Sequence, residues 1–173
     1  MKGLLIGFIG GLLTLPLIGF FYVRLGFAPV ATSAPPMPFE RYFARTAQHA
    51  RIDKEMPKQE PVAATEANLL AGVKTYREHC TVCHGLPGQP QSAIARGMFP
   101  QPPHFFDGHG VIDDPAVEIY WKVKNGIRLT GMPGFEKSFT EEQIWQVSLF
   151  LADADKLPES VLKQLKEAQP GRN

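Results

Sequence analysis

The pattern of hydrophobic and polar positions begins with a run from Gly3 to Val23 that contains no charged residue and is bracketed by Lys2 and Arg24. As a helix, such a run would be about 31 Å long at ~1.5 Å per residue, close to the thickness of the hydrocarbon core of a bilayer. A cleaved signal peptide and a buried core helix are the alternatives, but the apolar stretch of a signal peptide is usually only ~7–15 residues. We therefore predict a retained single transmembrane helix over residues 1–24.

Residues 25–65 break this pattern and are predicted to be a Pro-rich linker. The stretch APPMP at positions 34–38 favours stiff, extended backbone without a core pattern. Residues 39–56 are compatible with one helix, whose loose apolar side would carry Phe39, Tyr42, Phe43 and Ile52.

Helical spacing returns in two further segments. Gly72, Tyr76 and Cys80 are four residues apart, which places them on one face of a helix. Glycine weakens a helix by ~1 kcal/mol relative to alanine, so a close crossing by another helix is the expected reason for Gly72. The candidate partner begins at the capping-box sequence TEEQ (140–143) and continues with apolar residues at helical spacing.

Composition and charge narrow the class of protein. The 173 residues include 16 Pro and 16 Gly, which predicts long loops and short elements. The net charge of +1 argues against a nucleic-acid-binding protein held by bulk charge. Acidic residues concentrate in residues 66–155, with 11 acidic against 7 basic groups. We predict that residues 66–155 are the single globular domain and that residues 156–173 are a tail with a short helix.

The two cysteines lie in the pentapeptide Cys80-Thr81-Val82-Cys83-His84. This spacing is typical of covalent haem attachment, because two thiols three residues apart reach the two vinyl groups of one porphyrin and the histidine binds the iron. A zinc site would need four ligands, and the chain has no second cysteine pair. A thioredoxin-like redox pair would need a βαβ context, which the pattern does not provide.

Over residues 66–155 the chain resembles a class I c-type cytochrome. Four separate features carry the resemblance: the helix with glycine and an aromatic residue before the site, CTVCH itself, the helix ending near Asn125-Gly126, and the sequence GMPGF (131–135) before an aromatic C-terminal helix. The resemblance implies a small all-α fold around one covalently bound haem c and its iron, with the first and last helices crossing. The predicted fold class is therefore all-α, with this domain preceded by a transmembrane helix and a linker.

An electron carrier of this kind needs an iron ligand opposite His84. The candidates in the domain are Met98, Met132, His79, His104 and His109. Met132 lies in a loop bounded by Pro and Gly, its soft thioether suits haem iron, and the family places its distal methionine in such a loop. We therefore predict that Cys80, Cys83, His84 and Met132 bind the haem, with His84 and Met132 on the iron. The histidines, and an open site, remain alternatives.

Residues 85–110 form a Pro-rich loop. The resemblance implies that one of its backbone carbonyls accepts the Nδ1 proton of His84, and we expect this carbonyl near Pro100–Pro103. The aromatic residues expected to wall the haem are Phe105, Phe106, Tyr120 and Trp121.

Together these features predict a membrane-anchored, single-haem electron carrier rather than an enzyme, because no nucleophile–base pairing is evident. Its expected partners are redox proteins, such as membrane respiratory or photosynthetic complexes. Covalent haem is attached outside the cytoplasm in bacteria, so the predicted location is the cytoplasmic membrane with the haem domain in the periplasm. A haem enzyme or gas sensor with an open sixth position, and a structural subunit of a larger complex, are the alternatives.

Overall fold

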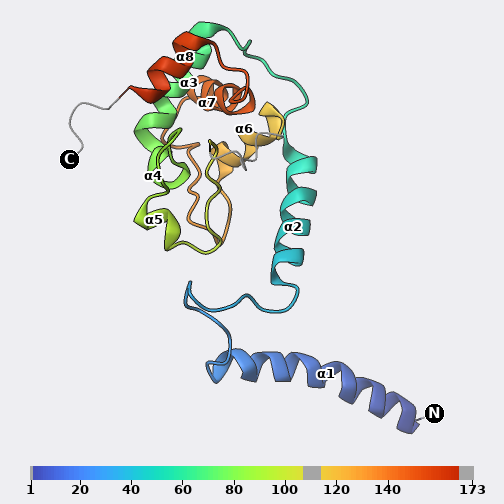
Figure 1. Cartoon of the computed structure of the whole chain (residues 1–173). Coiled ribbons are helices and arrows are strands. Elements are labelled where there is room, and N and C mark those ends of the chain that lie inside the picture. The colour runs from blue at the N-terminus through green and yellow to red at the C-terminus, as the bar shows by residue number, and fades with distance from the viewer. Residues whose placement is uncertain (1, 107–113, 168–173) are drawn as a thin grey trace. The chain divides into compact units, whose positions relative to one another are not determined.

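The computed structural model describes residues 2–106 and 114–167, with only the backbone at residues 4–6 and 9. All regular secondary structure in these ranges is helical (Figure 1). The chain divides into two units, Met1–Ala44 and Arg45–Asn173. In chain order the helices are α1 (Lys2–Arg24), α2 (Glu40–Glu55), α3 (Glu66–His79), α4 (Thr81–His84), α5 (Ala93–Arg96), α6 (Ala116–Asn125), α7 (Glu141–Ala152) and α8 (Glu159–Lys166).

The N-terminal segment requires a correction. It is a helix, α1, but in the described part of the chain no helix is both long and apolar enough to cross a membrane. The predicted transmembrane helix over residues 1–24 is therefore wrong. The prediction relied on length and on the absence of charge, and neither makes a helix apolar.

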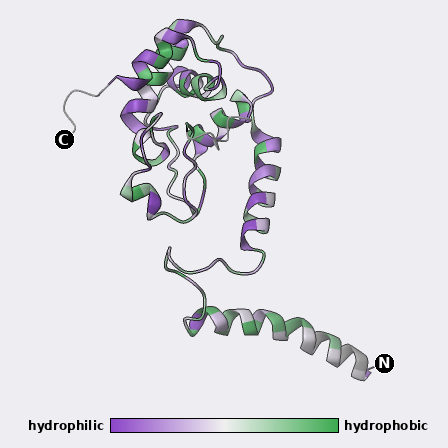
Figure 2. Cartoon of the chain, viewed as in Figure 1, coloured by the Kyte–Doolittle hydropathy of each residue, from purple (hydrophilic) through white to green (hydrophobic). Residues whose placement is uncertain are grey.

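Helix α2 lies in the segment between α1 and the predicted domain, and most of its surface is hydrophilic (Figure 2). Of the apolar side expected for this helix, Phe39, Tyr42 and Phe43 are exposed, and only Ile52 is buried. The indole Nε1 of Trp121, in α6, donates to Glu55 Oε2 at 3.3 Å. The end of α2 is therefore attached to the haem-domain segment by one buried side chain and one hydrogen bond.

Helices α3 and α7 cross closely, as the sequence pattern predicts. A Cβ on Gly72 would collide with the backbone carbonyl of Gln146 and with the Cβ of Phe150, so only glycine allows this approach. Each helix begins at a threonine whose side chain accepts a backbone N–H, Thr65 for α3 and Thr140 for α7. Both helix starts and the crossing are therefore encoded by local sequence.

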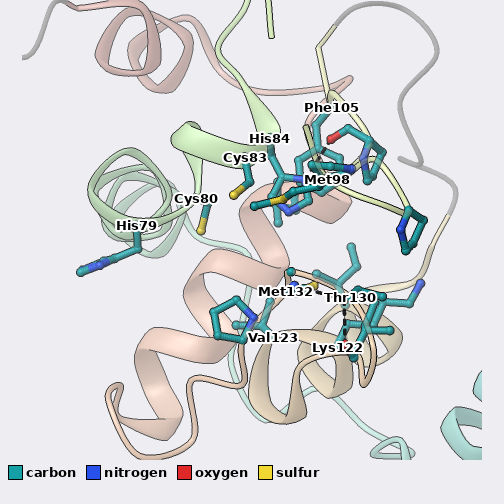
Figure 3. Close-up of a pocket in the computed structure, with 18 of the residues that line it drawn as sticks. His79, Cys80, Cys83, His84, Met98, Phe105, Lys122, Val123, Thr130 and Met132 are labelled. Atoms are coloured by element: carbon teal, nitrogen blue, oxygen red, sulfur yellow. Dashed lines mark hydrogen bonds between the residues drawn. The ribbon is translucent and has the colours of Figure 1, made fainter. Parts of the chain in front are cut away.

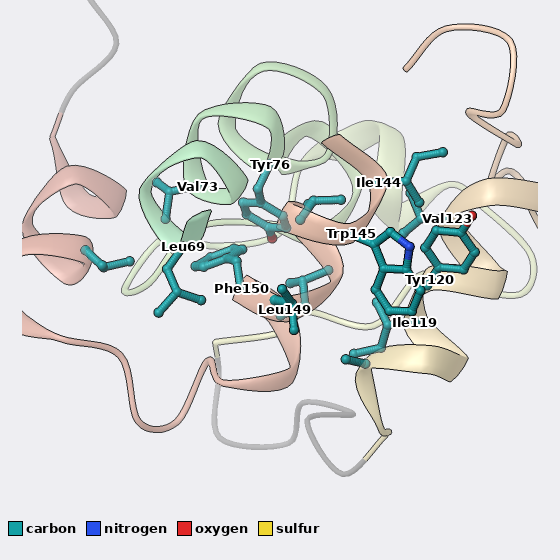
Figure 4. Packing of buried hydrophobic residues seen from close by; sticks show 14 of the residues in the cluster. Leu69, Val73, Tyr76, Ile119, Tyr120, Val123, Ile144, Trp145, Leu149 and Phe150 are labelled. Atoms are coloured by element: carbon teal, nitrogen blue, oxygen red, sulfur yellow. The ribbon is translucent and has the colours of Figure 1, made fainter. Parts of the chain in front are cut away.

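Two further helices complete the core around this crossing (Figure 4). Helix α6 packs on α7, where the rings of Tyr120 and Trp145 stack with centroids 4.1 Å apart. Helix α8, in the predicted tail, packs on α3 and buries Val161 and Leu165. The core thus fixes α3, α6, α7 and α8 together. Helix α3 then leads directly into the short helix α4, which carries the cysteine pentapeptide.

Candidate functional site

A mostly apolar cavity of about 410 Å³ lies beside α4 (Figure 3). This volume is within the range of small-molecule and cofactor pockets. Most of its lining comes from the junction of α3 and α4, the Pro-rich loop, α6, and the loop before α7, and Gln48 of α2 and Leu151 of α7 complete it. The predicted haem-binding residues Cys80, Cys83, His84 and Met132 all line this one cavity.

The two thiols enter the cavity from the end of α3 and from α4. Cys80 is the last residue of the α3 turn, and its backbone N–H donates to Tyr76 O at 2.8 Å. One further turn brings Cys83 to the same wall, and both cysteines are free thiols. Burial, and to a lesser degree the neighbouring Cys83, raise the pKa of Cys80 to about 12. Burial also raises the pKa of Cys83. Before haem attachment, both groups are therefore neutral thiols at physiological pH.

The imidazole of His84 is held in one orientation. Its Nδ1 lies 2.9 Å from the carbonyl oxygen of Pro103, and since a carbonyl only accepts, Nδ1 is the donor. This confirms the expectation of a carbonyl between Pro100 and Pro103. The ring also stacks on Phe105, with centroids 4.3 Å apart and planes 10° apart. Nε2 is then the ring nitrogen left as an acceptor for a metal.

The electrostatics of the cavity favour a neutral His84. Burial lowers its pKa, the hydrogen bond to Pro103 raises it, and the neighbouring His104 lowers it, with a net lowering. A neutral imidazole is the form that binds iron.

The backbone after His84 depends on a glycine. Gly85 has a φ of 76°, and a Cβ there would also collide with the ring of His104. Its carbonyl accepts a 2.7 Å hydrogen bond from the hydroxyl of Tyr76, which is fully buried in the core. The core helix α3 therefore fixes both ends of α4, through Cys80 and through this hydrogen bond.

Met132 projects from the loop between α6 and α7. Its backbone N–H donates to Thr130 Oγ1 at 3.1 Å, and its carbonyl accepts from Ile127 at 3.2 Å. Figure 3 shows Met132 and His84 on opposite sides of the cavity. Met98 lines the same cavity, and its sulfur would lie 2.9 Å from a Cβ on Gly131, so the Met98 side chain packs against the residue that precedes Met132.

The histidine alternatives lie in different surroundings. His104 is buried, its Nε2 lies 3.0 Å from Gln89 O, and its Nδ1 accepts from the Phe106 N–H at 3.2 Å. Both of its ring nitrogens are thus engaged in the fold. His79 is at the edge of the cavity, where its ring packs on Phe139, and Figure 3 shows it pointing away from the other labelled residues. His109 lies outside the described residues.

The expected aromatic wall is only partly correct. Phe105 lines the cavity, but in the described part of the lining Phe106, Tyr120 and Trp121 are absent. Phe106 packs on Tyr76 and Tyr120 on Trp145, so both belong to the core. Helical spacing identifies an apolar face, but it does not distinguish contact with a cofactor from contact with another helix.

Gln48 of α2 and Lys122 of α6 are two of the cavity residues that were not identified from the sequence. Gln48 lies in the predicted linker, outside the resemblance, and no local signal points to it. Lys122 lies four residues after Glu118, a spacing that predicts an ion pair on α6 but does not show which face of the helix borders the cavity.

The donor set fits a covalently attached haem. Two thiols at the vinyl spacing, an imidazole with a fixed tautomer, and the thioether of Met132 on the opposite side face one apolar space (Figure 3). No other metal fits as well, since the described residues contain no cluster of three or more His, Cys, Asp or Glu that could hold a metal ion.

The match to one protein family agrees with this geometry. Residues 67–151 match the family described as cytochrome C oxidase, cbb3-type, subunit III. No curated protein matches the chain. A chain of the Kuenenia stuttgartiensis reducing HAO-like protein complex is similar at 27% identity and a TM-score of 0.46, over 53% of this chain and 45% of that chain. Haem c with its iron is the cofactor that the family implies for this site. Residues 67–151 are therefore a c-type cytochrome domain, the type of domain that serves in electron transfer.

Proposed function

We propose that this protein is a monohaem electron carrier in which His84 and Met132 bind the iron from opposite sides. The observation that carries the proposal is the 2.9 Å contact between His84 Nδ1 and Pro103 O, which directs Nε2 into a cavity with Met132 on its other side. Sulfur and imidazole together favour a higher reduction potential than two imidazoles do.

Haem c supplies a one-electron couple at its iron, and the residues of this chain set its properties. Cys80 and Cys83 would hold the porphyrin through thioether bonds. The Pro103 carbonyl orients His84 and would increase its basicity as a ligand. Met132 would exclude water from the iron, and the apolar lining would lower the dielectric around it. None of these roles requires a substrate site, which favours electron transfer over catalysis.

The proposed partners are redox proteins, including membrane respiratory or photosynthetic complexes. Residues 66–155 carry 7 basic and 11 acidic groups, so a partner with a positive docking surface is favoured. We place the haem domain on the periplasmic side of a bacterial cell, because bacteria attach haem covalently outside the cytoplasm. Protease accessibility in spheroplasts tests this location: the haem-bearing fragment should be digested without lysis of the cytoplasmic membrane.

Spectroscopy of the purified holoprotein tests the ligand pair. A ferric haem with His and Met ligands is low-spin and shows a weak near-infrared sulfur band, and its ferrous form does not bind carbon monoxide readily. A high-spin spectrum with immediate carbon monoxide binding would instead support a haem enzyme or gas sensor with an open sixth position.

A further inference from the structure

A half-buried ion cluster borders the haem cavity. Lys122 Nζ lies 2.7 Å from Asp114 Oδ2 and 2.6 Å from Glu118 Oε1. The three side chains are 18%, 22% and 20% exposed, so the cluster is far less solvated than an ordinary surface ion pair. Lys122 and Asp114 both line the cavity. A charged group at the edge of an apolar cofactor site needs an explanation beyond helix stability, since a solvent-facing pair would stabilise α6 as well.

The position of the cluster relative to the cysteines supplies that explanation. Haem carries its vinyl groups on one edge and its two propionates on the opposite edge. Figure 3 shows Cys80 and Lys122 at opposite ends of the group of cavity residues. If Cys80 and Cys83 hold the vinyl edge, the anionic propionates are directed toward the end of the cavity that contains Lys122.

We propose that Lys122 and Gln48 form the binding site for the haem propionates, an inference that rests on the haem site proposed above. An ammonium has three N–H donors, and Asp114 and Glu118 take two of them. Among the described residues the third donor has no partner. Gln48 is half-buried and adds amide donors from α2, which lies outside the matched family region 67–151.

In this site, Asp114 and Glu118 position the ammonium and keep it charged. Burial alone would lower the pKa of Lys122, but its hydrogen bonds to the two carboxylates outweigh this effect and raise it. The ammonium of Lys122 favours an ionised propionate beside it and so lowers the pKa of that propionate, whereas the carboxylates of Asp114 and Glu118 act in the opposite direction. Removing the charge of Lys122 alone therefore raises the pKa of the propionate. The ammonium also opposes the positive charge gained by the iron on oxidation, which favours the ferrous form.

The test is the reduction potential of the full-length holoprotein, measured as a function of pH. A propionate that titrates differently in the two redox states produces a pH range over which the potential falls. The reduction potential of Lys122→Gln should be lower than that of the wild type. The pH range over which the potential falls should move to higher pH by about one unit, which is a tenfold change in the acidity of the propionate. Lys122→Arg keeps the charge and should restore both values.

Lys124→Gln is the matched control, because Lys124 lies on the same helix but pairs with Glu136 at 3.7 Å and does not line the cavity. It should leave the pH range unchanged. Gln48→Ala leaves the ion cluster intact and should move the range upward by a smaller amount, which supplies a second measurement if Lys122→Gln fails to fold. The proposal is overturned if Lys122→Gln and Lys124→Gln show the same dependence of reduction potential on pH. If Lys122→Gln does not fold, it is overturned when Gln48→Ala leaves the wild-type dependence unchanged. The sulfur band of the wild type, recorded separately, distinguishes this failure from a wrong ligand pair.

Discussion

Replacing Met132 with alanine removes the proposed sixth ligand while leaving Cys80, Cys83 and His84 in place. Two losses are expected. The first is packing: a fully buried methionine truncated to alanine costs about 2–5 kcal/mol, and Met132 is half-buried, so about 1–2 kcal/mol follows from packing alone. For a domain of this size that corresponds to a fall in Tm of roughly 4–15 °C. The second loss is the iron–sulfur bond, which adds to this fall in the holoprotein.

Met98→Ala is the matched control, because Met98 is also half-buried and lines the same cavity. Its packing loss should be similar, but it should keep the near-infrared sulfur band and the reduction potential. Met132→Ala should lose the band, bind carbon monoxide and show a lower potential, because water or hydroxide favours ferric iron more than a thioether does. If Met98→Ala loses the band while Met132→Ala keeps it, the ligand assignment is refuted. If both keep it while His104→Ala opens the site, the iron has two histidine ligands.

The other predictions concern the fold, the thiols and docking. Gly72→Ala should lower the free energy of unfolding by about 1–3 kcal/mol in urea titrations, because its Cβ collides with the backbone of α7, whereas Gly97→Ala meets its nearest neighbour only at 3.5 Å and should cost much less. In the protein before haem attachment, iodoacetamide should modify Cys80 slowly at neutral pH and faster as the pH rises toward the Cys80 pKa of about 12. Mass spectrometry measures the extent of labelling, and rapid labelling at pH 7 would contradict the burial of this thiol. Electron transfer to a cationic partner should slow as salt rises, because residues 66–155 carry a net −4 from 7 basic and 11 acidic groups, and a rate independent of salt would exclude electrostatic steering.

Some features of this protein follow from sequence because short-range rules determine them. The threonine caps of α3 and α7 and the four-residue spacing that ends at Cys80 depend on neighbours within one or two turns. Gly72 is a weak helix former whose presence predicts a close crossing, and the collision expected at α7 confirms it. The same local reasoning failed for α1, because it took the absence of charge as evidence of a transmembrane helix. Among the described helices none is long and apolar enough to cross a membrane.

The sequence by itself indicated the chemistry of the cofactor, because the spacing of Cys80, Cys83 and His84 is a local property that is typical of covalent haem attachment. Only the tertiary structure decided what surrounds it. The structure selects Pro103 from the expected stretch Pro100–Pro103 and brings Gln48 to the cavity from the predicted linker, and Lys122 lies on a helix whose pattern does not distinguish cavity from solvent. These contacts join residues 19 or more positions apart in sequence, and such approaches are determined by how the helices pack rather than by the residues next to each position.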